Sequence, residues 1–378
     1  LAGMNPLEKL IAQEIAEHGP ISFACFMERA LYHPAYGYYT RPGKKIGRQG
    51  DYYTSAHVSS LFGQAVARQL IEMGTILGWD GLALVEYGAG EGFLARDILA
   101  TLAQEMAAVP EGLPYYICEK SPSMRERQGS LLEPFLPQVR WLDDLAEINE
   151  GKPFKGIIFS NELVDAFPVH RVKLVEGELK EIYVDYRDGK LVEALGPLSD
   201  PRLGEYFPFL GFELQEGQEA EINLLALDWL AHIGRYLSCG FVLTIDYGYE
   251  VKELASPVRF AGTVMCYRQH RADAEALEDV GMKDITSHVN FTALMKYGEQ
   301  HGLQTVGFTN QMKFLAGLGI GRALEDPSLN PWERQKMALA LKELLMPDRM
   351  GERFRVLIQQ KGLPGVPELL GLKGFALG

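Results

Sequence analysis

The chain has 378 residues, of which 47% are apolar and 23% charged, the balance of a folded globular protein rather than a disordered or fibrous one. Its net charge of −13 at pH 7 argues against general nucleic-acid binding, which requires clustered lysine and arginine. No apolar run reaches the roughly 20 residues that cross a bilayer, so no membrane span is predicted.

The four cysteines lie far apart in the sequence and form no C-x-x-C pair. They are Cys25, Cys118, Cys239 and Cys266. This spacing disfavours both a zinc site of known pattern and a disulfide framework. We therefore predict no metal site, and a reducing compartment for which the cytoplasm is the simplest choice.

The first part of the chain, residues 1–80, is predicted to be a helical N-terminal region with a lid loop. Residues 6–19 and 21–33 show the helical spacing of apolar side chains, and Gly19-Pro20 separates them. The Gly- and Tyr-rich segment 33–55 follows, and its length exceeds that of ordinary connections. We expect this loop to close over a ligand, and a further helix over about 61–77.

From residue 81 to 378, short apolar strands alternate with helical segments. Strands are expected at 82–87, 115–120, 138–142, 156–162 and 241–248, with two late strands at 304–310 and 354–362. This alternation predicts an α/β fold, a Rossmann-like seven-stranded, mainly parallel sheet with helices on both faces. Two insertions, at about 168–220 and 249–284, are expected to carry β-hairpins and helices.

The first strand of this domain leads into the segment VEYGAGEG. Its G-x-G-x-G spacing differs from the G-x-G-x-x-G of dinucleotide sites, and Glu91 at the helix start would repel a phosphate. The pattern resembles motif I of class I S-adenosylmethionine-dependent methyltransferases, whose ligand carries no phosphate. The resemblance implies that Glu86, Gly88, Ala89 and Gly90 hold the amino-acid part of this ligand. The alternative is a tight strand-to-helix turn without a ligand.

Polar residues also follow the next strands, where ligands bind in such sheets. Glu119, with Lys120 beside it, ends the second strand and is expected to accept hydrogen bonds from ribose hydroxyls. After the third strand, Asp143 or Asp144 is expected to accept from an adenine amino group. Asp144 serves equally well as a helix N-cap. Asn161, at the end of the fourth strand, is expected to hold the methyl donor or a substrate amide.

Over almost its whole length the chain resembles the MidA-type family, which includes the mitochondrial complex I assembly methyltransferase. The matching segments are ALYHPAYGYY, GRQGDYYTS with LFGQ, VEYGAGEG, SNELVDAFPV, LTIDYG, GTVMCYRQH and DITSHVNF. The resemblance implies S-adenosyl-L-methionine as methyl donor and a protein substrate, in eukaryotic relatives an arginine of a respiratory complex I subunit. It adds Asp51 and Thr54 to the donor site. Many members have Pro-Glu after this Thr, whereas Ser55-Ala56-His57 stands here, so His57 is not included.

The proposed chemistry needs carboxylates close to the acceptor nitrogen. The sulfonium methyl is already activated, so the protein mainly aligns donor and acceptor. A guanidinium requires carboxylates that bind it bidentately and help it to lose a proton. Glu162 and Asp165 are the first candidates for catalytic residues, and Asp246 is the third.

Two other functions remain open from the sequence. The first is a methyltransferase-fold assembly factor that holds a protein partner without catalysis. The second is an NAD-dependent oxidoreductase, which the glycine spacing and Glu91 disfavour. The acceptor protein, the number of methyl groups added and the oligomeric state are left open.

Overall fold

The computed structural model describes residues 4–41, 55–105, 109–268, 271–363 and 371–377. The chain forms two compact units, which are described separately below. We call them the inserted unit and the sheet unit. The inserted unit comprises Leu1–Tyr52, Val164–Trp229 and Gly248–Lys296, and the sheet unit comprises Tyr53–Leu163, Leu230–Tyr247 and Tyr297–Gly378.

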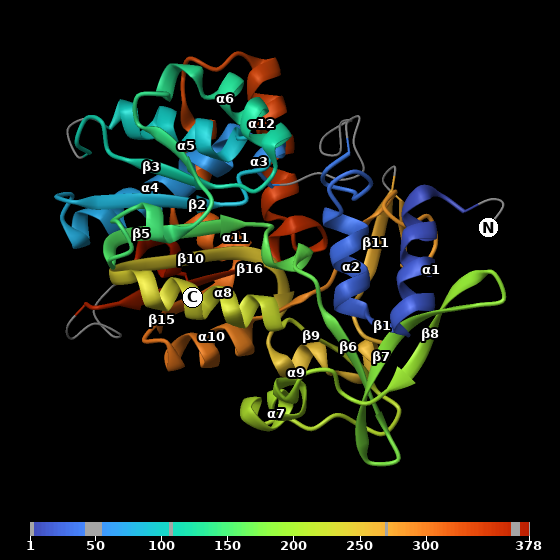
Figure 1. Cartoon of the computed structure of the whole chain (residues 1–378). Helices are drawn as coiled ribbons and strands as arrows, with labels where there is room; N and C mark the ends of the chain where they lie inside the picture. The colour runs from blue at the N-terminus through green and yellow to red at the C-terminus, as the bar shows by residue number, and fades with distance from the viewer. Residues whose placement is uncertain (1–3, 42–54, 106–108, 269–270, 364–370, 378) are drawn as a thin grey trace. The chain divides into compact units, whose positions relative to one another are not determined.

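The sheet unit is built on a mainly parallel sheet with the strand order β15-β16-β10-β5-β2-β3-β4 (Figure 1). The strands are β2 (Leu82–Tyr87), β3 (Tyr115–Cys118), β4 (Val139–Leu142), β5 (Phe154–Asn161), β10 (Leu237–Tyr249), β15 (Gln304–Asn310) and β16 (Phe354–Lys361). The first five of these run parallel, and β16 is antiparallel to both of its neighbours. The predicted mainly parallel α/β sheet is confirmed with its seven predicted strands, and a short eighth strand, β14, is added beside β10.

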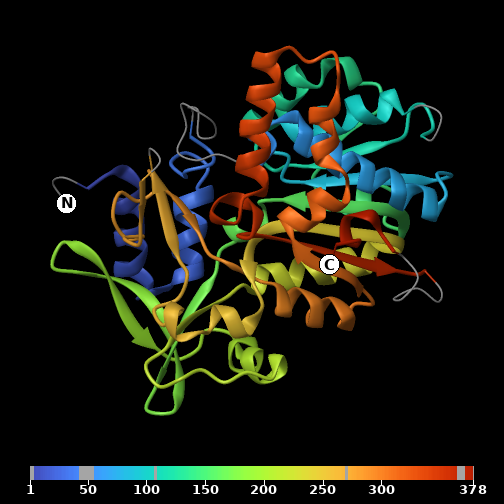
Figure 2. The same cartoon turned by 180° about the vertical axis from the view of Figure 1, so that it is seen from behind.

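Helices pack on both faces of this sheet, as Figures 1 and 2 show from opposite sides. In Figure 1, α4 and α5 lie on one side and α8 and α10 on the other. The central strands are buried on both faces, which explains their almost continuous apolar sequences. The helices are α3 (Ser55–Val58), α4 (Ser60–Leu77), α5 (Phe93–Gln104), α6 (Pro122–Leu131), α8 (Leu224–Tyr236), α10 (Phe291–Gln300), α11 (Gln311–Gly317) and α12 (Pro331–Leu345).

The inserted unit contains two small antiparallel sheets. One has the order β1-β7-β6-β9 with β8 added to β7, and the other has the order β12-β11-β13. Its strands are β1 (Ile21–Ser22), β6 (His170–Val175), β7 (Glu178–Arg187), β8 (Lys190–Gly196), β9 (Glu219–Ile222), β11 (Met265–Arg268), β12 (Arg271–Asp273) and β13 (Asp284–Thr286), while β14 (Val289–Asn290) pairs with the end of β10. Its helices are α1 (Pro6–His18), α2 (Phe23–Tyr32), α7 (Pro201–Leu210) and α9 (Val251–Leu254).

The hairpins expected in the first insertion are present. Glu176-Gly177 joins β6 to β7, and Asp188-Gly189 joins β7 to β8. All four of these residues have positive φ angles, between 50° and 84°. Such two-residue turns match the twist of the flanking strands, and glycine adopts them without strain.

The compact units divide the chain differently from the boundary expected at residue 80. Phe62 and Ala65 of α4 are fully buried and belong to the same core as Leu84 of β2 and Ile157 of β5. This packing places α4 in the sheet unit, so the units separate at residue 52 rather than 80. Both expected insertions fall within the inserted unit. In the part of the chain that is described, no helix is long and apolar enough to cross a membrane.

The core of the sheet unit yields a first prediction. Ile157 lies on the central strand β5 and is fully buried, so Ile157→Ala leaves a cavity and is expected to lower the free energy of unfolding by about 2–5 kcal/mol. Leu339→Ala, at a side chain 62% exposed on α12, is the control and is expected to change it by less than about 0.5 kcal/mol. Urea unfolding followed by circular dichroism measures both, and equal effects would contradict this assignment of the core.

Candidate functional site

The turn between β2 and α5 is a loop whose backbone angles favour glycine at three positions. Gly88, Gly90 and Gly92 have φ angles of 66°, 54° and 90°. A Cβ atom on Gly88 would lie 2.7 Å from Cδ1 of Leu163, the residue that follows Glu162. The loop therefore passes directly beside the end of β5. Its glycines allow both the sharp turn and this close approach.

Glu86 is the second-last residue of β2, shortly before the glycines, and it is buried. Its side chain is 2% exposed, and the hydroxyl of Tyr115 donates to its Oε2 at 2.5 Å. Burial raises the pKa of Glu86 to about 7, with a smaller contribution from the charge of Glu119, while the Tyr115 hydrogen bond acts in the opposite direction. The carboxyl group is thus held near its point of titration at neutral pH. Its contact with the donor stays a prediction.

Glu91 is paired with two basic side chains. Its Oε1 lies 3.2 Å from Nη1 of Arg127, and its Oε2 lies 3.5 Å from Nε2 of His57. Burial lowers the pKa of His57, although the Glu91 carboxylate raises it. Because Arg127 compensates part of the Glu91 charge, Glu91 excludes a phosphate less strongly than the sequence suggests. The glycine spacing remains the stronger argument against a dinucleotide.

Glu119 lies at the end of β3, as predicted for a ribose-binding carboxylate. Its Oε1 accepts from the backbone N–H of Ser121 at 2.8 Å, and its Oε2 accepts from Nε2 of Gln128 at 3.3 Å. Burial raises the pKa of Glu119, and these hydrogen bonds oppose the shift. Carboxylate oxygens accept more than one hydrogen bond each, so acceptor capacity remains for a ligand. Lys120 is exposed beside it.

The two aspartates after β4 differ in their contacts. The side chain of Asp143 is 80% exposed and pairs with Nη2 of Arg125 at 2.5 Å. Asp144 caps the 3₁₀ helix Leu145–Glu147, accepting from the N–H of Ala146 at 2.7 Å. The N-cap interpretation of Asp144 is confirmed. An adenine contact by either residue stays a prediction.

At the end of β5, Glu162 adopts a backbone conformation that side chains rarely occupy. Its φ angle is 53°, and its N–H donates to the carbonyl of Ile245 at 2.9 Å. Its Oε1 accepts from the N–H of Ser55 at 3.0 Å and from Nδ2 of Asn161 at 2.9 Å. Strained residues of this kind cluster at functional sites, where surrounding contacts hold them in place.

Asp246, at the end of β10, supplies some of these contacts. Its side chain is fully buried, its Oδ2 accepts from the N–H of Leu163 at 3.1 Å, and its Oδ1 accepts from the N–H of Tyr247 at 2.8 Å. Asp246 therefore holds the turn that carries Glu162. Whether it also contacts a substrate stays a prediction.

The remaining candidates belong to the inserted unit or lie outside the described residues. Asp165 belongs to the inserted unit, where it is 7% exposed and its backbone carbonyl accepts from the N–H of Ser287 at 3.0 Å. Asp51 and Thr54 lie outside the described residues. The sheet unit thus brings together the glycine loop, Glu119, Asn161, Glu162 and Asp246 at the carboxyl ends of its strands.

One buried atom supports a ligand at this edge. Oδ1 of Asn161 is buried and accepts no hydrogen bond from any described residue. A buried acceptor without a donor is costly, which fits a site completed by a ligand with N–H groups. The α-ammonium group of S-adenosylmethionine carries such donors, so the residues present fit this molecule.

Ser55 and Gln128 contact predicted site residues, although no sequence pattern marks either of them. Ser55 acts through its backbone N–H, which no side-chain pattern reveals. Gln128 lies on α6, whose sequence PSMRERQGSL is mostly polar and shows no clear apolar face, so the burial of Gln128 has no sequence signal.

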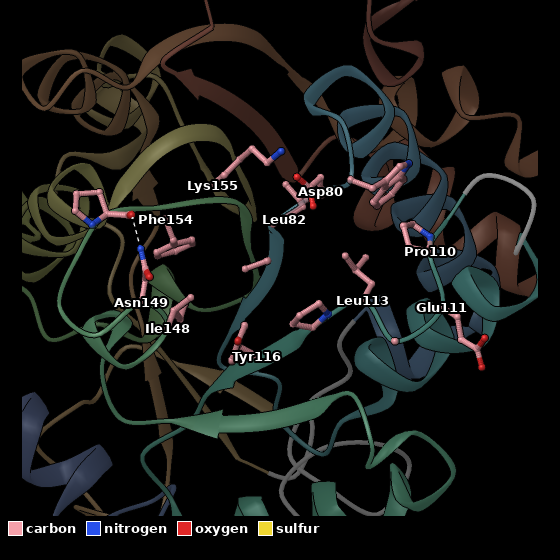
Figure 3. Close-up of a pocket in the computed structure, with 16 residues that line it drawn as sticks. Asp80, Leu82, Pro110, Glu111, Leu113, Tyr116, Ile148, Asn149, Phe154 and Lys155 are labelled. Carbon is pink, nitrogen blue, oxygen red and sulfur yellow. Dashed lines mark hydrogen bonds between the residues drawn. The ribbon is translucent and has the colours of Figure 1, made fainter.

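A separate hollow of about 680 Å³ lies at the opposite edge of the same sheet, where β2, β3 and β5 begin (Figure 3). Leu82, Leu113 and Phe154 contribute to its wall, and Asn149 donates to the carbonyl of Pro153 at 2.9 Å beside it. It contains none of the predicted site residues.

Comparison with known proteins identifies the family of the chain and the ligand of that family. The model of a family described as "Putative S-adenosyl-L-methionine-dependent methyltransferase" matches residues 65–309. The chain belongs to this family. Its methyl donor is S-adenosyl-L-methionine, and the predicted enzyme class is confirmed.

Individual proteins extend the match to the whole chain. One similar solved structure is a likely methyl transferase of the COG1565 superfamily from Burkholderia thailandensis, with S-adenosyl-homocysteine bound. Its sequence is 31% identical to this chain, and the TM-score is 0.86. The match covers 100% of this chain and 98% of that one. The "Protein arginine methyltransferase NDUFAF7, mitochondrial" of Danio rerio is 27% identical over 92% of this chain and 85% of its own length. The Homo sapiens protein of the same name is 26% identical over 93% and 82%. These relatives confirm the MidA-type resemblance.

The prediction of a cytoplasmic location is wrong by this comparison, because the curated relatives are named mitochondrial proteins. The prediction rested on widely spaced cysteines, which indicate reducing conditions only. Reducing conditions are not confined to the cytoplasm, so cysteine spacing cannot choose between compartments.

Glu86 gives a second prediction, on pH dependence. Its pKa is raised from 4.5 to about 7 in the folded protein, so its contribution to stability is present below pH 4.5 and is lost as the pH rises through 7. Glu86→Gln removes this titrating group. We therefore expect the free energy of unfolding of the variant, minus that of the native protein, to rise by up to about 3 kcal/mol between pH 5 and pH 8. Urea unfolding at the two pH values measures the change, and a difference independent of pH would contradict it.

Proposed function

We propose that the enzyme transfers a methyl group to an arginine side chain of a protein substrate, with Glu162 as the residue that receives the guanidinium. The observation that carries the proposal is the conformation of Glu162, a carboxylate held at φ 53° beside the glycine loop by hydrogen bonds from Ser55 and Asn161. The curated relatives named protein arginine methyltransferases support the choice of acceptor.

The donor supplies an activated methyl group on a sulfonium sulfur when it is bound. The chain's own task is to hold donor and acceptor in line and to orient the attacking nitrogen. Under this proposal Gly88, Ala89, Gly90 and Asn161 hold the amino-acid arm, and Glu119 holds the ribose. Adenine is assigned to the segment of Asp143 and Asp144, and Asp51 and Thr54 complete the donor site.

The acceptor side of the proposal rests on carboxylates. A planar guanidinium forms paired, charge-assisted hydrogen bonds with a carboxylate, and a nearby carboxylate helps it to lose a proton during attack. Glu162 takes this role and Asp246 supports the turn that carries it, while Asp165 stays a candidate from the sequence alone. The acceptor we propose, following the MidA-type resemblance, is a respiratory-complex subunit.

Glu162→Gln tests the proposal. Loss of the negative charge is expected to reduce methyl transfer from labelled S-adenosylmethionine by at least about a hundredfold, while the Kd for S-adenosylhomocysteine changes less than threefold. Mass spectrometry of labelled proteins from a lysate of the source organism identifies the modified residue, which we expect to be arginine.

The matched control is Glu150→Gln. Glu150 is a glutamate of the same unit with a similar φ of 51°, but it is exposed in the turn before β5. This variant is expected to retain full activity. Label on lysine would overturn the choice of acceptor, and donor binding without transfer to any protein would favour the non-catalytic assembly factor.

A further inference from the structure

Gln128 joins three parts of the donor site through one buried side chain. The residue lies on α6 and is fully buried. Its Nε2 donates to the carbonyl of Gly90 in the glycine loop at 2.7 Å and to Oε2 of Glu119 at 3.3 Å. Its Oε1 accepts from the indole N–H of Trp141 on β4 at 2.7 Å. The glycine loop, the residue that follows β3, and β4 thus meet at one amide of α6.

The chemistry of these partners fixes the orientation of the amide. The indole nitrogen of Trp141 only donates, so it requires the oxygen of Gln128. The Gly90 carbonyl and the Glu119 carboxylate accept, so they require the nitrogen. A flipped amide would place like groups against each other on both sides and leave buried groups unsatisfied, at a cost of about 1–3 kcal/mol for each.

We propose that Gln128 is a positioning residue for the methyl donor, coupling the carboxylate that binds ribose to the loop that holds the amino-acid arm. Its two N–H groups set the direction of Glu119 Oε2 and of the Gly90 carbonyl together. The indole of Trp141 keeps the amide from rotating. The inference rests on the donor site described above and does not depend on arginine as the acceptor.

The hydrogen bond from Gln128 also affects the pKa of Glu119. Burial raises the pKa of Glu119, and the hydrogen bond from Gln128 is among the contacts that lower it. An ionised carboxylate accepts from both ribose hydroxyls, whereas a protonated one must donate at one oxygen. The hydrogen bond from Gln128 therefore favours the ionised form of Glu119, which accepts from both ribose hydroxyls.

The test compares the affinity of the full chain for S-adenosylhomocysteine with its affinity for the 2′,3′-dideoxyribose analogue, by calorimetry. The native protein is expected to prefer the ribose form by at least about tenfold, the value of one hydrogen bond to a charged group. In Gln128→Met, which keeps the length of the side chain, this preference is expected to fall to less than threefold. The exposed Gln335→Met on α12 is the control and should leave it unchanged.

Trp141→Phe provides a second route if Gln128→Met does not fold. It removes the N–H that anchors the amide, together with part of the indole ring, and we expect the preference for ribose to fall about threefold. Equal losses of affinity for both ligands in either folded variant would show a purely structural role and overturn the inference. Binding of neither ligand by the native protein would instead contradict the donor site itself. No methyl transfer is measured, so failure of the arginine proposal leaves this test unaffected.

Discussion

The parallel pairing of β2 with β3 and β5 is the constraint on which the rest of the site depends. In this register Tyr87 lies opposite Cys118 on one side and Ser160 on the other. The residues that follow the three strands therefore reach the same edge of the sheet. They are the glycine loop, Glu119 and the pair Asn161-Glu162. A shift of one residue would exchange the two buried faces of these strands and disrupt the packing on both, so the core fixes the site.

The backbone of the site is strained at Glu162, and contacts from the neighbouring strand offset this strain. A side chain at the φ angle of Glu162 costs about 1–3 kcal/mol, and the structure offsets this through the carbonyl of Ile245 and the carboxylate of Asp246. Both lie on β10, the strand next to β5. The strand β10 thus contributes to the core and also holds the turn that carries the proposed catalytic residue. The same contacts therefore support both the folded sheet and the site.

Much of this architecture is predictable from sequence because it depends on local patterns. The buried strands follow from apolar runs, the two hairpins from Glu176-Gly177 and Asp188-Gly189, and the site edge from the residues after each strand. The position of α4 was not predictable, because its side chains pack on strands that come later in the chain. Gln128 was missed for a similar reason, since its three partners are separated by up to 51 residues of sequence, from Gly90 to Trp141. Patterns within one element do not report such contacts.

The central claim is that the loop from Gly88 to Gly92 serves S-adenosylmethionine rather than a dinucleotide. The most direct test is a calorimetric titration of the full chain with S-adenosylhomocysteine and, separately, with NAD. We predict stoichiometric binding of S-adenosylhomocysteine and no measurable heat of binding with NAD under the same conditions. Tight binding of NAD without binding of the sulfur ligand would contradict the account.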